Sequence, residues 1–253
     1  MTMKRILKNL TLSLVFFGTS YACLPAQIVS IQYRHVPQDN IAEFIHRETT
    51  YWSQVAQKAV DDGKLVSWPL WQKVGGWNLP ERSNFMFVNV FAGPEDLSHQ
   101  GEIWGAAAEM FPDARMANIS TNDLGTVNHQ IFLQGVAREG DGQPDFVRIN
   151  YAKASDMAKY LELEQSAWQP FIKEQMESKK TTQLTWRLAQ LIMPSGTDLP
   201  FNAVTADGYN TVGEAIAPNG TFAEGTEFPD LSALNEVHEK AYIQVYRRVK
   251  SVQ

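Results

Sequence analysis

The sequence repeats itself at long range, and this repeat constrains the fold more than any other feature. Residues 28–36 (IVSIQYRHV) and 146–154 (FVRINYAKA) both alternate apolar and polar side chains, as β-strands do. Tyr33 and Tyr151 occupy matching places in them, 118 residues apart. A chain that repeats a strand at this spacing is predicted to contain two copies of one structural unit.

Each repeated strand is followed by an amphipathic helical stripe. A glutamate precedes a tryptophan by four residues in both stripes, Glu48 before Trp52 and Glu164 before Trp168. The other apolar residues of each stripe recur at the three- and four-residue spacing of a helix that packs on a sheet. The repeat therefore extends from the strand through the helix.

The later segments also pair between the two copies. We expect second strands that contain Trp68 and Trp186, and third strands over 85–91 and 201–207. Helical stretches follow over 95–110 and 229–242, and closing strands over 127–136 and 243–249. The order in each copy is β-α-β-β-α-β, the ferredoxin-like pattern. The predicted fold class is α+β, with two ferredoxin-like repeats that bury their open sheet faces against each other in a pseudo-dimeric α/β barrel.

The predicted domain boundaries follow from the same pattern. Residues 27–138 form the first repeat and 146–253 the second, and the polar, Gly-rich segment 139–145 is the linker. We expect a monomer with an internal pseudo-two-fold axis.

The chain resembles the tandem, exported members of the dimeric α/β-barrel superfamily. The motifs that carry the resemblance lie in the second copy: Tyr160-Leu-Glu-Leu-Glu164, Trp168-Gln-Pro-Phe, Trp186-Arg-Leu and Met193-Pro-Ser-Gly196. Other branches of that superfamily include cofactor-free monooxygenases, small cyclases and haem proteins. The resemblance therefore implies a fold and leaves the function open.

The first 26 residues have the layout of a bacterial secretory signal peptide. Lys4, Arg5 and Lys8 precede a short apolar run, and small residues follow it. We expect cleavage after Ala22 or after residue 26 and a periplasmic or secreted product. Cys23, the single cysteine, raises lipid anchoring as an alternative, but the residue three before it is not the usual Leu, which disfavours it.

Charge argues against two classes of partner. The formal net charge is −6 and becomes −9 without the three cations of residues 1–26. Nucleic acids and anionic membranes attract basic patches, and the sequence has no run of Lys or Arg. No later segment reaches the length of about 20 apolar residues that a spanning helix needs. We expect a small-molecule ligand, no nucleic acid and no membrane span.

The polar faces of the central strands supply the predicted ligand site. If Val29, Ile31 and Tyr33 face the helices, the alternate side chains face the barrel interior. This reasoning places the following residues around an interior site: Gln32, Arg34, Asn89, Arg148, Asn150 and Thr205. Two guanidinium groups there would hold an anion such as a carboxylate or enolate, or would pair with acidic residues of the protein itself.

Three carboxylates are weak catalytic candidates: Glu48, Glu164 and Asp207. Burial of the two glutamates in apolar helical stripes would raise their pKa values toward the range of a general acid or base. The same glutamate in both copies also suits a structural hydrogen bond, and the sequence favours this second interpretation.

The stretch WPLWQKVGGW (68–77) holds three tryptophans. Trp68 has a counterpart in Trp186 and is predicted to be core. Trp71 and Trp77 have none and are predicted to shape the entrance of the ligand site.

No metal site or cofactor is predicted. The five histidines lack the spacing of a metal site, and no Walker loop, dinucleotide fingerprint or Gly-x-Ser-x-Gly motif is present. The leading hypothesis is an exported small-molecule binding protein. The alternatives are a cofactor-independent monooxygenase- or cyclase-like enzyme that uses an interior carboxylate, and an envelope scaffold with a packed barrel.

Overall fold

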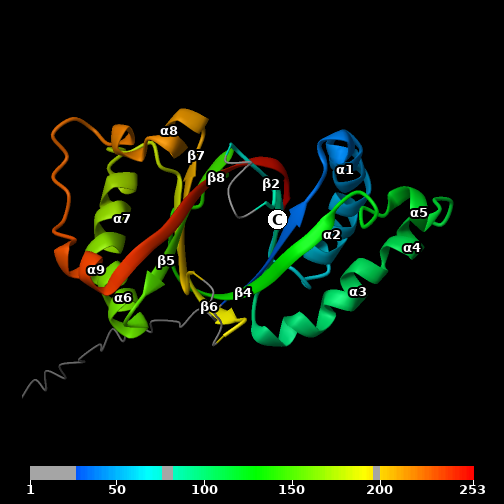
Figure 1. Ribbon diagram of the computed structural model, residues 1–253, viewed down its shortest axis with the longest axis horizontal. Helices are drawn as coiled ribbons and strands as arrows, with labels where there is room; N and C mark the ends of the chain where they lie inside the picture. The colour runs from blue at the N-terminus through cyan, green and yellow to red at the C-terminus, as the bar shows by residue number, and fades with distance from the viewer. Residues whose placement is uncertain (1–26, 76–81, 196–199) are drawn as a thin grey trace, which may run out of the picture.

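A computed structural model describes residues 27–75, 82–195 and 200–253. Within these ranges eight strands close into an antiparallel barrel in the order β1-β3-β2-β8-β5-β7-β6-β4. Helices α1 to α5 lie on one side of the barrel and helices α6 to α9 on the opposite side (Figure 1). The prediction of a mixed α/β fold built around a barrel is confirmed.

The first half of the chain supplies four neighbouring strands, in the order β4-β1-β3-β2. Its strands are β1 (Ile28–His35), β2 (Trp68–Lys73), β3 (Phe85–Phe91) and β4 (Thr126–Glu139). Its helical segments are η1 (Gln38–Asn40), α1 (Ile41–Arg47), η2 (Glu48–Trp52), α2 (Ser53–Asp61), η3 (Pro94–His99), α3 (Gln100–Gly105), α4 (Ala107–Met110) and α5 (Met116–Ile119). The expected helical stretch at 95–110 is present as η3, α3 and α4.

The second half supplies the other four strands, in the order β8-β5-β7-β6. Its strands are β5 (Phe146–Ala154), β6 (Thr185–Met193), β7 (Ala203–Tyr209) and β8 (His238–Val252). Its helical segments are α6 (Met157–Leu163), η4 (Glu164–Trp168), α7 (Gln169–Glu177), α8 (Val212–Ile216), η5 (Pro218–Thr221) and α9 (Ser232–Val237).

The predicted helix over 229–242 is wrong at its end. Helix α9 ends at Val237, and β8 begins at His238. β8 pairs with β5 as far as Ala154, opposite His238. The long β5 needs a partner along its whole length to satisfy its backbone groups, and this pairing overrides the local helical pattern.

Two seams join the halves. β2 pairs with β8, and β4 pairs with β6, both antiparallel. The barrel therefore has no free strand edge, which removes the unpaired backbone groups that open sheets must cover.

Both faces of the barrel wall are buried. The interior is filled by one apolar cluster to which all eight strands contribute: Ile31, Tyr33, Trp71, Met86, Ile131, Leu133, Val147, Ile149, Tyr151, Val204 and Tyr246, with Ala189 and Leu191 partly buried. The hydroxyls of Tyr33 and Tyr151 meet at 2.7 Å and link the first strands of the two halves. The interior is thus a packed core that joins the halves.

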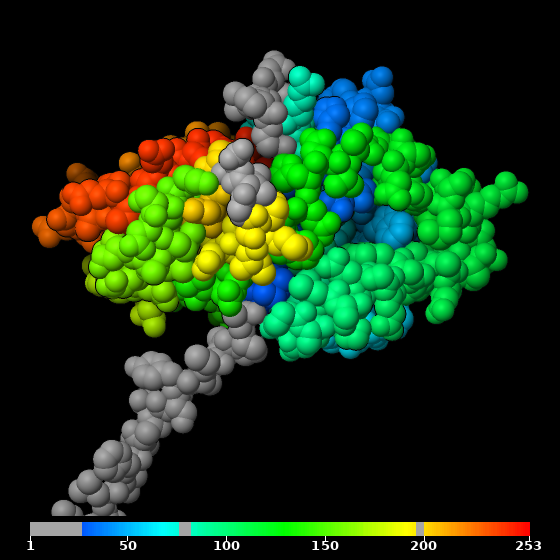
Figure 2. Space-filling view, turned by 60° about the horizontal axis from the view of Figure 1, so that its bottom comes forward, coloured from blue at the N-terminus to red at the C-terminus, as the bar shows by residue number. Residues whose placement is uncertain are grey.

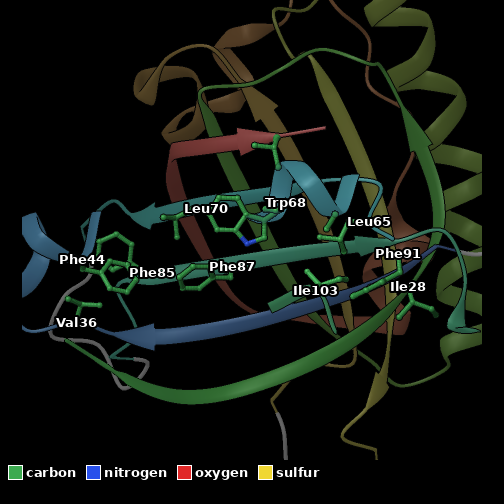
Figure 3. Close-up of a cluster of buried hydrophobic side chains, with 13 residues drawn as sticks. Ile28, Val36, Phe44, Leu65, Trp68, Leu70, Phe85, Phe87, Phe91 and Ile103 are labelled. Atoms are coloured by element: carbon green, nitrogen blue, oxygen red, sulfur yellow. The ribbon is translucent and has the colours of Figure 1, made fainter. Parts of the chain in front are cut away.

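A second apolar layer lies between the first-half sheet and its helices (Figure 3). Trp68 is 1% exposed in this layer and stands near Phe87, with ring centroids 6.0 Å apart. Phe44 of α1 meets Phe85 at 4.7 Å. Trp186 takes the matching place under the second-half helices, also 1% exposed. Trp68 and Trp186 are core residues of the helix-facing layers, as the repeat predicted.

Candidate functional site

The polar residues of the central strands do not face the barrel interior, so the predicted interior site is wrong. Tyr33 and Ile31 fill the interior, and the side chains that alternate with them, Gln32 and Arg34, point outward under the helices. Arg148 and Asn150 do the same in the second half. Strand alternation separates two faces, but here both faces are buried, so polarity alone could not tell which one is interior.

In the first half, hydrogen bonds join Gln32, Arg34, Thr121 and Glu48 into what we call the Glu48 cluster, and Asn89 lies on the same face of the sheet, on the strand next to Gln32. The Arg34 guanidinium donates from Nε to Gln32 Oε1 at 2.7 Å and from Nη1 to Thr121 Oγ1 at 3.1 Å. It lies 4.9 Å from the centroid of the Phe87 ring, a cation–π arrangement. Thr121 Oγ1 in turn donates to Glu48 Oε1 at 2.7 Å. A sheet cation and a helix carboxyl are therefore connected through one hydroxyl.

Glu48 is placed by an unusual piece of helix. It is the first residue of the π-helical segment η2, which separates α1 from α2. A π-helical turn widens the helix, and such turns are frequent at functional sites. Here it aims a carboxyl that is 3% exposed toward the sheet.

The charge state of Glu48 is set by opposing effects. Burial raises the pKa of Glu48 from its ordinary 4.5 to about 7, while the Thr121 hydrogen bond and the charge of Arg34 oppose the rise. Burial also lowers the pKa of Arg34, although the charge of Glu48 works against this. A carboxyl with a pKa near neutrality can take up or release a proton at physiological pH, as a general acid or base must.

Asn89 has a side-chain oxygen without a partner. It stands on β3 opposite Ser30, one place along from Gln32 on the same helix-facing side of the sheet. The residue is 8% exposed, and its Oδ1 is buried and accepts no hydrogen bond within the described residues. Buried acceptors are almost always satisfied in native proteins, so this atom calls for a donor, from a ligand or a water molecule.

The loop that carries Thr121 is tied to the helix that carries Glu48. Trp52 Nε1 donates to Ile119 O at 2.8 Å, and Arg47 Nη1 donates to Ser120 O at 2.5 Å. Figure 2 shows atoms of the N-terminal elements, in blue, recessed between the green surfaces of β4 and of the α3–α5 region. The Glu48 cluster is thus held together by helix, loop and sheet, and the molecular surface is hollowed between β4 and α3–α5.

In the second half the outward residues form what we call the Asp207 cluster: Arg148, Asn150, Gln183, Thr205 and Asp207. Asn150 Nδ2 donates to Asp207 Oδ2 at 2.9 Å and lies 3.1 Å from Thr205 Oγ1. Gln183 Nε2 donates to Asp207 Oδ1 at 3.0 Å. Arg148 donates from Nε to Asn150 Oδ1 at 3.2 Å. Both oxygens of the carboxylate are occupied by protein donors.

Glu164 faces the Asp207 cluster from the helix side. Like Glu48 it begins a π-helical segment, η4, and it is 6% exposed. Burial raises its pKa to about 7, opposed by a hydrogen bond with Tyr160, and the charge of Asp207 raises it further. Burial raises the pKa of Asp207 to about 6, while its hydrogen bond to Asn150 and the charge of Arg148 oppose the rise.

Register shows that the two arginines are not counterparts. Because Tyr33 matches Tyr151, Arg34 matches Ala152, and Arg148 matches Ser30. Arg34 and Arg148 lie on opposite halves, outside the barrel wall, and cannot hold one ligand in the interior.

The same register pairs Asn89 with Asp207, because Ser30 lies opposite Asn89 and Arg148 opposite Asp207. The sequence comparison had grouped Asn89 with Thr205. The side chains at this position differ in kind, an amide in the first half and a carboxylate in the second.

The remaining predicted residues divide as follows. Trp71 is 8% exposed and belongs to the interior cluster, on the opposite face of the barrel wall from the Glu48 cluster. Trp77 lies outside the described residues. Thr121 and Gln183 were missed, because each sits in a loop segment with no periodic pattern to mark it.

Two further kinds of feature are absent from the described ranges. No group of three or more His, Cys, Asp or Glu side chains there could hold a metal ion. No helix in these ranges is long and apolar enough to cross a membrane.

Comparisons with known proteins identify the fold. No family model matches the sequence, and no curated protein matches it. Among solved structures, the chain is similar to the putative monooxygenase from Lactobacillus acidophilus NCFM, with a TM-score of 0.59 and 12% identity over 90% of this chain and 96% of that chain.

Two further solved structures give the same result. The putative monooxygenase from Fusobacterium nucleatum subsp. nucleatum ATCC 25586 has a TM-score of 0.55 and 9% identity, over 90% and 95% of the two chains. An anthrone oxidase-like protein has a TM-score of 0.52 and 11% identity, over 89% and 92%. The chain has the dimeric α/β-barrel fold, as the resemblance predicted.

Proposed function

We propose that this protein binds a small, weakly acidic organic molecule between the first-half sheet and its helices, and that Glu48 exchanges a proton with it. The observation that carries the proposal is the Glu48 cluster itself. A buried carboxyl with a pKa of about 7 is linked through Thr121 to a cation, and a buried amide oxygen that lacks a donor lies on the same face of the sheet as that cation.

The chemistry of these groups defines the ligand. Asn89 Oδ1 requires a donor such as a hydroxyl. Glu48 accepts a proton when it is ionised, and Arg34 stabilises negative charge that develops on the ligand as the proton leaves. Phe87, Phe132 and Trp104 of the same helix-facing layer offer apolar and aromatic surface to a flat molecule. A phenol has a flat apolar ring and a weakly acidic hydroxyl, which can donate its one hydrogen either to Asn89 Oδ1 or to Glu48.

The fold neighbours favour a second candidate function. Three similar structures belong to proteins named as monooxygenases or as anthrone oxidase-like. We therefore infer, as the alternative, a cofactor-independent monooxygenase- or cyclase-like enzyme in which Glu48 is the general base. Binding with proton exchange is common to both candidates, and only the second requires turnover.

The proposal also includes an internal duplication of the fold and a cellular location for the protein. We infer that each half is a ferredoxin-like repeat, because the strand orders β4-β1-β3-β2 and β8-β5-β7-β6 are the same and both long helices contain a π-helical segment. The halves correspond to 27–138 and 146–253. The signal-like sequence of residues 1–26 supports a periplasmic or secreted location.

A thermal-shift experiment with 1-naphthol tests the proposal. 1-Naphthol is flat and weakly acidic, and 1-methoxynaphthalene has the same rings without a donor. We expect 1-naphthol to raise the Tm of the wild type and 1-methoxynaphthalene to leave it unchanged. The Glu48→Gln variant should lose the rise.

The second half provides a matched control. Glu164→Gln changes an equally buried glutamate at the same place in a π-helical segment, and it should keep the rise in Tm. An unchanged rise in Glu48→Gln, or its loss in Glu164→Gln alone, would exclude the Glu48 cluster as the site.

A further inference from the structure

The hydroxyl of Thr121 has a fixed direction. A guanidinium has only donors, so Arg34 Nη1 must donate to Thr121 Oγ1. The single hydrogen of that hydroxyl is then directed at Glu48 Oε1, 2.7 Å away. With the hydroxyl in this direction, Oε1 is the acceptor in the contact in both charge states of the carboxyl.

This direction distinguishes the two oxygens of Glu48. Oε1 is occupied by the Thr121 hydroxyl, and Thr121 is the one side chain of the described residues that bonds to this carboxyl. In this arrangement the proton of the neutral carboxyl resides on Oε2. Proton exchange with any ligand takes place at Oε2.

Charges near the carboxyl come from each element that packs around it. Arg34 on β1 is the cation that acts on Glu48, and it does so across the Thr121 hydroxyl. On the outer side of the loop, Arg47 pairs with Glu43 and with Asp123, whose side chain is 60% exposed. The two carboxylates are exposed to solvent, and Arg47, whose side chain is 13% exposed, is paired with both of them. Thr121 and Arg34 therefore dominate the surroundings of Glu48.

We propose that Thr121 is a positioning residue for proton exchange by Glu48: its hydroxyl, oriented by Arg34, occupies Oε1 and leaves Oε2 as the atom that takes and returns the proton. This inference rests on the function proposed above. It assigns a role to a residue in the loop between α5 and β4 that touches the carboxyl and has no place in the sequence repeat.

Among the described residues of the second half, the buried glutamate at this position has no hydroxyl partner from a loop. Glu164 begins the same π-helical segment, but its partner is Tyr160, four residues earlier on its own helix. The first half has Phe44 four residues before Glu48, which cannot donate a hydrogen bond. Tyr160 hydrogen-bonds with Glu164 from the same helix, whereas Glu48 receives its hydrogen bond from Thr121, in a loop distant in sequence that also contacts Arg34.

The test is a carbon-13 NMR titration of the Glu48 side-chain carboxyl in the ligand-free protein, with Glu48→Gln used to assign the signal. In Thr121→Val, and in Thr121→Ala should the valine variant fold poorly, we expect the pKa of Glu48 to rise by about one unit, since a charge-assisted hydrogen bond to the ionised form is lost. Thr121→Ser retains the hydroxyl and should restore the wild-type value.

The signal of Glu164 is the internal control and should titrate identically in all variants. An unchanged or lowered pKa of Glu48 in both Thr121→Val and Thr121→Ala would overturn the inference, as would a serine variant that titrates like the valine variant. Because no ligand is present, these outcomes are independent of the 1-naphthol experiment. Failure of that experiment rejects the proposed function, and failure of this titration rejects the role of Thr121.

Discussion

The two halves of this barrel place a glutamate at the start of the same π-helical segment and surround it differently. Glu48 meets a threonine from a loop and an arginine from the sheet, near an amide oxygen without a donor. Glu164 faces an aspartate whose two oxygens are held by amide donors. The shared feature belongs to the fold, and the differences indicate where a ligand would bind.

The comparison distinguishes a buried charge that the protein itself hydrogen-bonds fully from one that lies in a region with an unsatisfied polar group. A buried carboxylate is costly unless it is hydrogen-bonded. The second half meets this cost with Asn150 and Gln183, which close the Asp207 cluster. On the first-half sheet Asn89 Oδ1 is unsatisfied, and an unsatisfied buried polar group calls for an explanation such as a ligand, a catalytic role or a water molecule. Among the described residues of the second half, the unsatisfied buried oxygen is Gln175 Oε1 on α7, which is not a member of the Asp207 cluster.

The largest expected effect tests whether the halves are equivalent in their cores. Trp68→Ala and Trp186→Ala each remove a fully buried ring from a helix-facing layer. Each should lower the free energy of unfolding by about 3–5 kcal/mol, measured by urea denaturation. A loss of stability in one variant only would show that one half does not depend on its tryptophan and would weaken the repeat interpretation.

The next effect concerns pH. The pKa values of Glu48 and Glu164 are about 7 in the folded protein, above the ordinary 4.5, so the folded state binds protons more tightly than the unfolded state. This contribution to stability is fully present below about pH 4.5 and is lost as the pH rises through 7. Each carboxyl should account for a loss of about 3 kcal/mol between these limits.

Urea denaturation at a series of pH values checks this prediction. The decline in stability should be shallower in Glu48→Gln and in Glu164→Gln by similar amounts, and Glu43→Gln, an exposed residue of the same helix as Glu48, should match the wild type. Two glutamine variants that decline as steeply as the wild type would show that neither carboxyl is protonated in the folded state at neutral pH.

The smallest expected effect compares an amide that donates to the buried carboxylate of the Asp207 cluster with Asn89, whose buried oxygen has no donor. Asn150→Leu removes a donor to Asp207 and should cost about 2 kcal/mol, because a buried carboxylate loses a hydrogen bond. Asn89→Leu removes an oxygen that has no donor in the described residues and should change stability by less than about 1 kcal/mol. Equal losses of stability in the two variants would mean that a bound water donates to Asn89 and that the polar groups of the first half are as fully hydrogen-bonded as those of the second.

Much of the fold was predictable from the sequence, because the two halves of the chain have similar sequence patterns. The strands at β1 and β5, the helices that follow them and the core positions of Trp68 and Trp186 were found by comparing the two copies. The end of α9 was not, because residues 238–242 pair with β5 through contacts distant in sequence. Strand pairing of this kind leaves no local signal.

For the Glu48 cluster, several of its residues were predictable from the sequence, and their position outside the barrel wall was not. Gln32, Arg34 and Glu48 were identified as chemically informative, but the strand face was inverted, because a wall that is buried on both sides presents polar residues to helices as readily as to an interior. The joining of Arg34 to Glu48 depends on Thr121, which lies in an irregular loop. The mismatch of Asn89 with Asp207 required the strand register.

The central claim is that the ligand binds in the first half, outside the barrel wall. NMR chemical-shift mapping of the protein titrated with 1-naphthol tests it most directly. The account predicts the largest perturbations at Gln32, Asn89 and Thr121, with the Asp207 cluster unaffected. Perturbations centred on Asn150 and Asp207, or on Tyr33 and Tyr151 in the interior, would contradict it.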